Sequence, residues 1–440
     1  MTAILLLADT VLTLDAQDHI YHPGYLVVEN NRIVETGWED NLAARHFDSQ
    51  VNLSNRLIMP GLVNAHTHTP MVLFRGMAEP YSLFTFEGWY EGIRRLEAVM
   101  SPEMVPPAVA VSCAEMIRTG TTCFADQYFY MDQVIPIVRQ SGMRASLAYG
   151  IVELGDPQVR RRELGILESF LESLQGDSKI RGWVGPHAFF VDNSLEAIRM
   201  ELALASRFDA GLHFHFATSG EEDRYCQEKY GRSAIQQMKA LGILNYQLLA
   251  AHGITIPPED FADLAGSNLT VVIAPSACMR SGSAIAPLKA MLAAGIHAAL
   301  GTDNVANNNS YDLFKEMRSA AQLMSSRERE PNAIPAREIL SLATLGGARG
   351  LGLEQEIGSL EAGKKADIIS LDLDEIGWTP TGAQDLYTAL VHTINGQYVR
   401  DVMVDGAWLY REGRWMTLDY ARARQELEAA NAELRKRLSK

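Results

Sequence analysis

The stretch that decides the fold is LIMPGLVNAHTH, residues 57–68, in which an apolar strand-forming run ends in two histidines. His66 and His68 are two positions apart, and in a β-strand such residues face the same side. Both imidazoles therefore point to one place at the end of a buried strand. Neutral imidazole is a common metal ligand, so the pair supplies half of a tetrahedral site, although two polar residues in a turn are the alternative.

The composition is that of a globular chain without a basic surface. The sequence has 440 residues, of which 47% are hydrophobic and 21% charged, and its formal net charge is −15. These values are typical of a folded enzyme and exclude a disordered chain. No basic run precedes the C-terminal tail, so we expect a small-molecule substrate and no nucleic-acid partner.

Cysteine usage and hydrophobic segments bear on the compartment. Cys113, Cys123, Cys226 and Cys278 form no CxxC pair, which indicates reduced thiols and predicts a cytoplasmic protein. The beginning, MTAILLLADT, lacks a basic segment, and we interpret its short apolar run as a strand and not as a signal peptide. No apolar stretch reaches ~18 residues, so we expect no membrane span.

From residue 57 onward, short apolar runs alternate with helical patterns. The apolar runs are 57–65, 122–126, 144–150, 181–186, 211–216, 246–251, 269–274 and 296–301. The helical patterns include 101–120, 193–208, 231–243, 311–326 and 335–349. Before the second of these, Asp192 and Asn193 are a cap signal. Strands that alternate with helices in this number predict an α/β fold, the (β/α)8 TIM barrel. An open doubly wound sheet would need a glycine-rich phosphate loop after its first strand, and the sequence has none.

Both ends of the chain have β character. Short apolar or alternating runs fill the first 58 residues, and the pattern returns to β after residue 357. We therefore predict a small β-sandwich domain built from 1–58 and 357–415, beside a barrel at 59–356. The remaining segment, 416–440, is rich in Ala, Glu, Arg and Leu and predicts a surface helix.

Chemistry in such a barrel lies at the carboxyl ends of the strands, so the polar residues there are the candidates. Six of the eleven histidines follow the predicted strands, and scattered core histidines would not sort in this way. This distribution favours a metal site. The polar residues at the strand ends are His66, His68, Asp126, Glu153, His187, His213, His215, Thr218, His252 and Asp303.

Three histidines and one aspartate are the expected metal ligands. They are His66, His68, His215 and Asp303. This donor set suits Zn²⁺, with Fe²⁺, Co²⁺ and Mn²⁺ as alternatives. His252 is either a fifth ligand or the residue that orients the water. His213 lies one layer deeper than His215, and we favour a role in filling the barrel over one in ligation.

These residues occur in motifs that resemble the amidohydrolase superfamily. The matching motifs are HTH at 66–68 after PGLVNA, GPH at 185–187, AHG at 251–253 and GTDN at 301–304. The chain is most similar to the aminohydrolase branch, which includes methylthioadenosine/S-adenosylhomocysteine deaminases and triazine hydrolases. TPMVLFRGMA at 69–78 and FADQYF at 124–129 look most like those deaminases. The resemblance covers nearly the whole chain, from 32–37 to 358–367.

The resemblance implies hydrolysis by metal-activated water, with one Zn²⁺ per chain. The fourth strand run, GWVGPHA at 182–188, supports a single ion separately, because it has no lysine that could bridge two metals. Asp303 would accept the water proton as general base, and His252 would polarise the attacked carbon or hold the water. His187 is the implied substrate contact, and the branch leans to homodimers or higher assemblies.

Two segments depart from the deaminase pattern. There the fifth strand is followed by His-x-x-Glu, and this Glu moves protons; here Thr218 occupies this catalytic position, and its hydroxyl is no such acid. Glu221 and Glu222 either reach the site or begin a solvated acidic helix, and we favour the helix start. After the seventh strand, IAPSAC at 273–278 lacks the polar groups of the relatives.

Further substrate contacts are expected from two segments. Asn304 and Asn307 follow the metal-binding aspartate. Residues 79–100 interleave aromatics with Glu, which suits a lid over a planar substrate, although ordinary helix packing is the alternative. Within this segment we assign substrate contact to Trp89 and Glu97. Glu97 is the nearest match to a ribose-holding Glu of adenosylhomocysteine deaminases, with the spacing off by about one residue.

The sequence thus predicts a mononuclear metal-dependent hydrolase that deaminates a nitrogen heterocycle of the purine, pterin or triazine type. The departures leave two alternatives open. One is hydrolysis at a different leaving group, such as chloride, an alkylamine or an amide. The other is a catalytically silent, metal-bearing binding protein.

Overall fold

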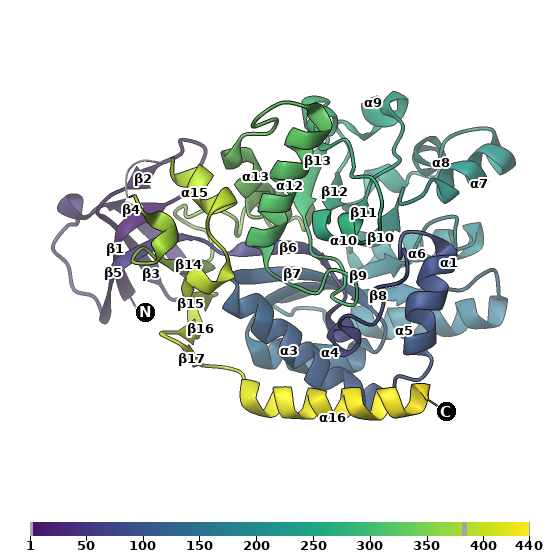
Figure 1. Ribbon diagram of the computed structural model, residues 1–440, viewed down its shortest axis with the longest axis horizontal. Helices are drawn as coiled ribbons and strands as arrows, with labels where there is room; N and C mark the ends of the chain where they lie inside the picture. Colours follow the sequence, from purple (N-terminus) through teal and green to yellow (C-terminus); the bar gives the residue numbers. More distant parts are fainter. Residues whose placement is uncertain (1–2, 381–384, 440) are drawn as a thin grey trace.

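The computed structural model describes residues 3–380 and 385–439, which form a barrel with a β-sheet at one side (Figure 1). The barrel strands are β6 (Leu62–Thr67), β7 (Thr121–Tyr128), β8 (Arg144–Ile151), β9 (Ile180–Pro186), β10 (Leu212–Phe216), β11 (Leu248–His252), β12 (Leu269–Ile273) and β13 (His297–Leu300). Each pairs in parallel with the next, and a bridge between Thr67 and Asp303 brings the two edges together. The predicted eight-stranded α/β barrel is confirmed.

Helices surround the strands in the expected alternation. The longer ones are α3 (Val105–Arg118), α4 (Met131–Ser141), α5 (Pro157–Ser173), α6 (Leu195–Phe208), α7 (Glu221–Tyr230) and α12 (Leu313–Glu328). The shorter ones are α1 (Phe86–Trp89), α2 (Arg95–Glu97), α8 (Ala234–Ala240), α9 (Phe261–Leu264), α10 (Pro275–Arg280), α11 (Leu288–Ala293), α13 (Ala336–Leu342), α14 (Leu345–Gly350) and α15 (Leu386–His392). Among the described residues, no helix has the length and hydrophobicity that crossing a bilayer requires.

The start of α6 corrects one detail of the sequence interpretation. Its N-cap is Ser194, whose side chain accepts a hydrogen bond from the N–H of Ala197, as serine commonly does at this position. The predicted cap signal at Asp192 and Asn193 therefore serves another purpose, which the site explains.

The predicted first barrel strand, 57–65, is two strands. Residues up to Pro60 end β5 (Ser49–Pro60) in the lateral sheet, and β6 begins at Leu62 in the barrel. Gly61 makes the transition at a very close approach, since a Cβ there would lie 2.1 Å from Oγ1 of Thr122. Any larger residue would push β6 away from β7, so this glycine couples the two sheets.

The lateral sheet combines both ends of the chain, as predicted for the β domain. Its N-terminal strands are β1 (Ala3–Leu12), β2 (Ile20–Tyr21), β3 (Gly24–Glu29), β4 (Arg32–Trp38) and β5. Its C-terminal strands are β14 (Ile368–Asp372), β15 (Val399–Val404), β16 (Ala407–Arg411) and β17 (Arg414–Trp415). Antiparallel pairing of β5 with β14 joins the two sets, and the sheet has its own core around Leu26, Ile58 and Met403. The exact domain boundaries stay a prediction.

A buried ion pair fastens this sheet to the barrel. Arg144, at the beginning of β8, donates from Nε and Nη2 to both carboxylate oxygens of Asp367, at 2.9 and 3.1 Å. Both side chains are almost fully buried, and such bidentate pairing fixes geometry as well as charge. The chain then ends in α16 (Tyr420–Leu438), which packs along α3 at the lower edge of the view (Figure 1).

Candidate active site

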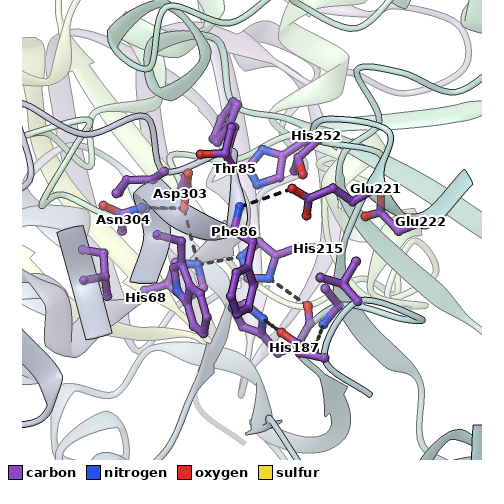
Figure 2. A pocket seen from close by; sticks show the side chains of 18 of the residues that line it. His68, Thr85, Phe86, His187, His215, Glu221, Glu222, His252, Asp303 and Asn304 are labelled. Carbon is purple, nitrogen blue, oxygen red and sulfur yellow. Dashed lines mark hydrogen bonds and ion pairs between the residues drawn. The ribbon is translucent and has the colours of Figure 1, made fainter. Parts of the chain in front are cut away.

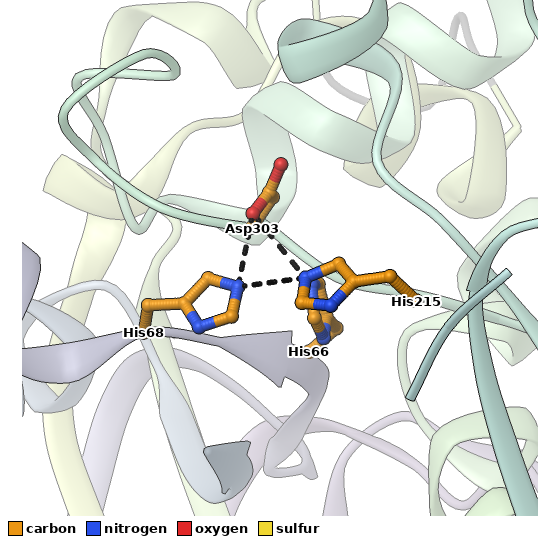
Figure 3. Close-up of side chains that lie close together, drawn as sticks. All are labelled: His66, His68, His215 and Asp303. Atoms are coloured by element: carbon orange, nitrogen blue, oxygen red, sulfur yellow. Dashed lines mark hydrogen bonds and ion pairs between the residues drawn. The ribbon is translucent and has the colours of Figure 1, made fainter. Parts of the chain in front are cut away.

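Four side chains converge at the carboxyl ends of three strand regions. His66 lies on β6, His68 directly follows β6, His215 lies on β10, and Asp303 follows β13 (Figure 3). Their ligand atoms all lie within 4.8 Å of one another, and His66, His68 and Asp303 are buried. The structure thus brings together the four residues that the sequence assigned to a metal.

Hydrogen bonds fix the orientation of each imidazole. Nδ1 of His68 donates to the carbonyl of Gln127 at 2.6 Å, and Nδ1 of His215 donates to the carbonyl of His187 at 2.9 Å. Nδ1 of His66 lies 2.7 Å from Nε2 of His213. With the Nδ1 atoms so engaged, the Nε2 lone pairs are the ones that face the centre, as outer hydrogen bonds arrange them in metal sites.

The distances at the centre fit a tetrahedral cation. Nε2 of His215 is 3.2 Å from Nε2 of His68, and Oδ1 of Asp303 is 3.4 Å from Nε2 of His68 and 3.6 Å from Nε2 of His66. Ligand atoms ~2.0–2.1 Å from one ion at tetrahedral corners lie about 3.3 Å apart. Nε2 of His66 is buried without a hydrogen-bond partner in the described part of the chain, which an ion would satisfy.

The protonation states of His66, His215 and Asp303 suit the same donor set. Burial lowers the pKa of His66 to about 4 and that of His215 well below its ordinary value, so both are neutral at pH 7. Burial would raise the pKa of Asp303, but the close polar contacts with His66 and His68 hold it well below its ordinary value. Neutral imidazoles and an ionised carboxylate are the forms that bind divalent metals.

Strained backbone marks the strand ends that carry the site. Asp303 has φ of +57° and His252 has φ of +86°, a backbone region that is uncommon for residues other than glycine. Asn304 stabilises the first of these turns, because its backbone N–H and its side-chain amide donate to Oδ1 of Asp303 at 2.6 and 3.0 Å.

His252 lies beside the four converging side chains and not among them. Its ring centroid is 5.6 Å from those of His66 and His215, and burial lowers its pKa to about 3. Its Nδ1 has no hydrogen-bond partner among residues 3–380 and 385–439. A neutral, unbonded imidazole here can accept or donate to a water or a substrate in the cleft.

A cleft opens above this centre (Figure 2). The site residues that line it are His68, His187, His215, Thr218, Glu221, Glu222, His252, Asp303 and Asn304. The segment before β7 contributes Leu83, Phe84, Thr85, Phe86, Trp89 and Ile93, so the predicted lid forms one wall of the cleft.

The lid packs against residues 273–278, the segment after the seventh strand that lacks the polar groups of the relatives. Phe84 packs with Ala274, Ala277 and Cys278 in a small buried cluster, and its ring lies 4.4 Å from that of His252. The small apolar residues that replace the polar groups of the relatives therefore seat an aromatic ring of the lid.

His187 is held by a residue that the sequence analysis assigned elsewhere. Its Nδ1 donates to Oδ2 of Asp192 at 2.5 Å, and its ring lies 4.7 Å from that of Trp89. Oδ1 of Asp192 also accepts from the N–H of Ala188 at 3.0 Å. Asp192, which was predicted as part of a helix cap, therefore provides the carboxylate that orients His187. With Nδ1 of His187 engaged by this carboxylate, its Nε2 can face the cleft.

The acidic pair after Thr218 also differs from expectation. Glu221 is partly exposed, and its Oε1 accepts from the N–H of Phe86 at 3.4 Å, across to the lid. Glu222 is only 3% exposed and lines the cleft, so the interpretation as a solvated helix start is wrong for this residue. Sequence could not show this, because burial depends on the turn that precedes α7.

Two other candidates lie away from the cleft. Glu97 faces a neighbouring cavity and accepts a hydrogen bond from Arg94 at 2.8 Å; a π turn at Tyr90–Arg94 shifts its register within the lid. Asn307 donates to Oγ of Ser281 at 2.8 Å. Their substrate roles stay predictions.

Two residues at the ends of β7 and β8 brace the structure around the site. Asp126 accepts hydrogen bonds from the hydroxyls of Thr67 and Thr69, which border the metal-binding histidines. Glu153 accepts from the N–H of Ser194 at 2.6 Å. Both are structural partners, and neither lines the cleft.

Comparison with known proteins gives a consistent result over the whole chain. The model of a family described as the Amidohydrolase family matches residues 57–409. A protein of Methanosarcina mazei named 5'-deoxyadenosine deaminase is 36% identical over 438 residues, which cover 99% of each chain. A protein of Moorella thermoacetica named 5-methylthioadenosine/S-adenosylhomocysteine deaminase is 36% identical over 400 residues, 90% of this chain and 92% of the relative.

A solved structure extends the similarity to three dimensions. The crystal structure of an adenosine deaminase from Xanthomonas campestris, with bound Zn, superposes with a TM-score of 0.92 at 28% identity. The match covers 99% of both chains. The barrel and the lateral sheet are therefore shared by this chain and that solved structure.

Proposed function

Because the chain belongs to the amidohydrolase family, we propose that it is a Zn²⁺-dependent hydrolase that removes an amino group from a nitrogen heterocycle. The observation that carries the proposal is the convergence of His66, His68, His215 and Asp303 at distances that fit one tetrahedral ion. The relatives named deaminases, which cover nearly the whole chain, support the same reaction. The zinc-bound structural neighbour supports the choice of metal.

An adenosine-type nucleoside is the first candidate substrate. The two curated relatives carry the names of deaminases of 5'-deoxyadenosine and of 5-methylthioadenosine/S-adenosylhomocysteine. The cleft has an aromatic wall at Phe84 and Trp89, which suits a planar base. His187, with Nδ1 engaged by Asp192, presents Nε2 to such a base.

The residues of the chain divide the chemistry among them. The ion supplies Lewis-acid activation of water when bound. Asp303 accepts the first proton of the attacking water, because its carboxylate is ionised and lies beside the centre. His252, whose ring lies 5.6 Å from that of His215, holds the water or polarises the attacked carbon. The lid excludes bulk water, which strengthens each of these interactions.

Thr218 favours a second candidate function. It occupies a position that lines the cleft, and a threonine hydroxyl does not serve as an acid at neutral pH. A leaving group that departs as an anion, such as chloride from a triazine, needs no proton. Displacement of such a group is the alternative reaction for the same site.

Product analysis separates these functions. Purified protein loaded with Zn²⁺ should contain one equivalent of metal and should release ammonia from adenosine, 5'-deoxyadenosine or a related nucleoside. Aminopterins and chlorinated or aminated triazines complete the panel, with metal-stripped protein as control. Chloride or alkylamine release supports the alternative, and binding without turnover supports a silent binding protein.

A further inference from the structure

The turn after β10 holds Glu222 in the wall of the cleft. The chain reverses at Ala217, which has φ of +53°, and the N–H of Ala217 donates to Oε1 of Glu222 at 3.1 Å. The carbonyl of Ala217 accepts from the N–H of Thr255 at 2.9 Å, three residues beyond His252. Glu222 is thereby fixed at the turn that leads from His215 to Thr218.

The second oxygen of this carboxyl group has no partner. Oε2 of Glu222 is shielded from solvent and makes no hydrogen bond within the described chain. Buried polar atoms are nearly always hydrogen-bonded, so an orphan in a cleft wall indicates a missing ligand. An unpaired buried carboxylate is costly, whereas a protonated one leaves a single O–H to satisfy.

The charges around Glu222 also favour its neutral form. Burial raises its pKa to about 7, and the neighbouring carboxylates Glu221 and Asp223 on the same helix act in the same direction. The titratable groups that face the cleft from other elements are His68, His187, Asp192, His215, His252 and Asp303.

The other carboxyl groups of the cleft have assigned partners. Asp303 belongs to the metal-binding set and is ionised. Asp192 accepts from His187 and from the backbone. Glu221 is partly exposed and accepts from the lid. Glu222 remains as the carboxyl group that combines burial, contact with the cleft and a free oxygen.

We propose that Glu222 is the acid of this site and donates its proton to a ring nitrogen of the substrate, a role that rests on the proposed deamination. As the water oxygen bonds to the ring carbon, one water proton passes to Asp303, the ring C=N bond becomes single, and the ring nitrogen takes the Glu222 proton. The C–N bond to the amino group then breaks, and ammonia leaves with the proton from Asp303. The remaining hydroxyl proton returns to Glu222 as the carbonyl forms, so both residues regain their starting states.

The test compares Glu222→Gln with Glu228→Gln, an exposed position on the same helix. Glutamine keeps an oxygen for the N–H of Ala217 but has no transferable acid proton. Deamination by zinc-loaded Glu222→Gln should fall ~10²–10⁴-fold with metal content unchanged, whereas Glu228→Gln should match wild type. Glu222→Asp should retain more activity than the glutamine variant. Wild-type turnover by Glu222→Gln would overturn the proposal.

An infrared measurement tests the same residue without turnover. The difference spectrum between wild type and Glu222→Gln should contain a protonated-carboxyl band at pH 6 that disappears by pH 9. Absence of this band at pH 6 would overturn the proposal. If the band is present but no aminated heterocycle is deaminated, the proposed function fails while the neutral state of Glu222 stands.

If the glutamine variant does not fold, the pH profile of the wild-type protein tests whether Glu222 is the acid. An acid must be protonated to act, so kcat should decline as the pH rises through about 7. A profile that stays flat from pH 6 to 9 would contradict the assignment.

Discussion

The two sides of the cleft floor differ in how completely their polar atoms are paired. On the side of β6 and β13, His68 donates through its outer Nδ1, Oδ1 of Asp303 accepts from the N–H of Asn304, and the ligand atoms converge on one point. On the side of β10 to β12, Oε2 of Glu222 and Nδ1 of His252 are buried and unpaired. The first arrangement is complete apart from one ion, while the second is complete only with a larger ligand.

This difference teaches which part of the site tolerates change. Tetrahedral coordination fixes ligand positions within a few tenths of an ångström. The residues on the side of β6 and β13, here called the ion-binding side, can therefore be replaced by few other residues. The side of β10 to β12, here called the ligand-binding side, must match the shape of a substrate and supply the protons that its reaction requires. The departures at Thr218 and at residues 273–278 both fall on this second side.

Removing a ligand on the ion-binding side should have the largest effect. His66→Ala and His68→Ala should each lose the zinc ion and all measurable turnover, because either leaves the tetrahedral set one donor short. Metal analysis after gel filtration and an ammonia assay give the two readouts. His46→Ala, at an exposed position, is the control. Full zinc occupancy in either ligand variant would contradict the assigned set.

Asp303→Asn should separate metal binding from catalysis on the same side. The amide oxygen can still coordinate, but the amide cannot accept the water proton. We expect zinc to be largely retained and kcat to fall ~10²–10⁴-fold. Near-normal turnover with bound zinc would show that another group is the base.

Phe84→Ala tests the apolar seat on the ligand-binding side. The ring is buried against Ala277, Cys278 and His252, and removing such a ring costs ~3–5 kcal/mol of packing. Part of that loss should weaken closure of the lid and raise KM about 10–100-fold, with a smaller effect on kcat. Tyr90→Ala, which removes an exposed lid residue, is the control. An unchanged KM would mean that the lid does not depend on this contact.

The fold was largely predictable because strand and helix periodicity reflect burial over many residues. The prediction of the first barrel strand was wrong where a single residue determines the path of the chain. Gly61 divides the predicted strand in two, because only a glycine fits against Thr122. The ion-binding side was predictable, since His66 and His68 follow a strand at the spacing of one face. The ligand-binding side was not, since the burial of Glu222 depends on the tertiary position of a turn.

The smallest expected effect concerns Thr218→Glu. If this protein had merely lost an acid, the new carboxyl group should raise deamination, by up to ~10²–10⁴-fold. With Glu222 already buried four residues away, a second carboxyl group should instead interact unfavourably with it and with Asp303, because like charges raise one pKa of the group and crowd the cleft. We therefore expect kcat to fall by less than about tenfold in the wild-type background.

In the Glu222→Gln background, the same substitution should increase kcat, since it then supplies the only neutral carboxyl group at this turn. The measurement is kcat for the four proteins from pH 5 to 9. A Thr218→Glu variant faster than wild type at every pH would show that the ligand-binding side has merely lost an acid and is not adapted to Thr218.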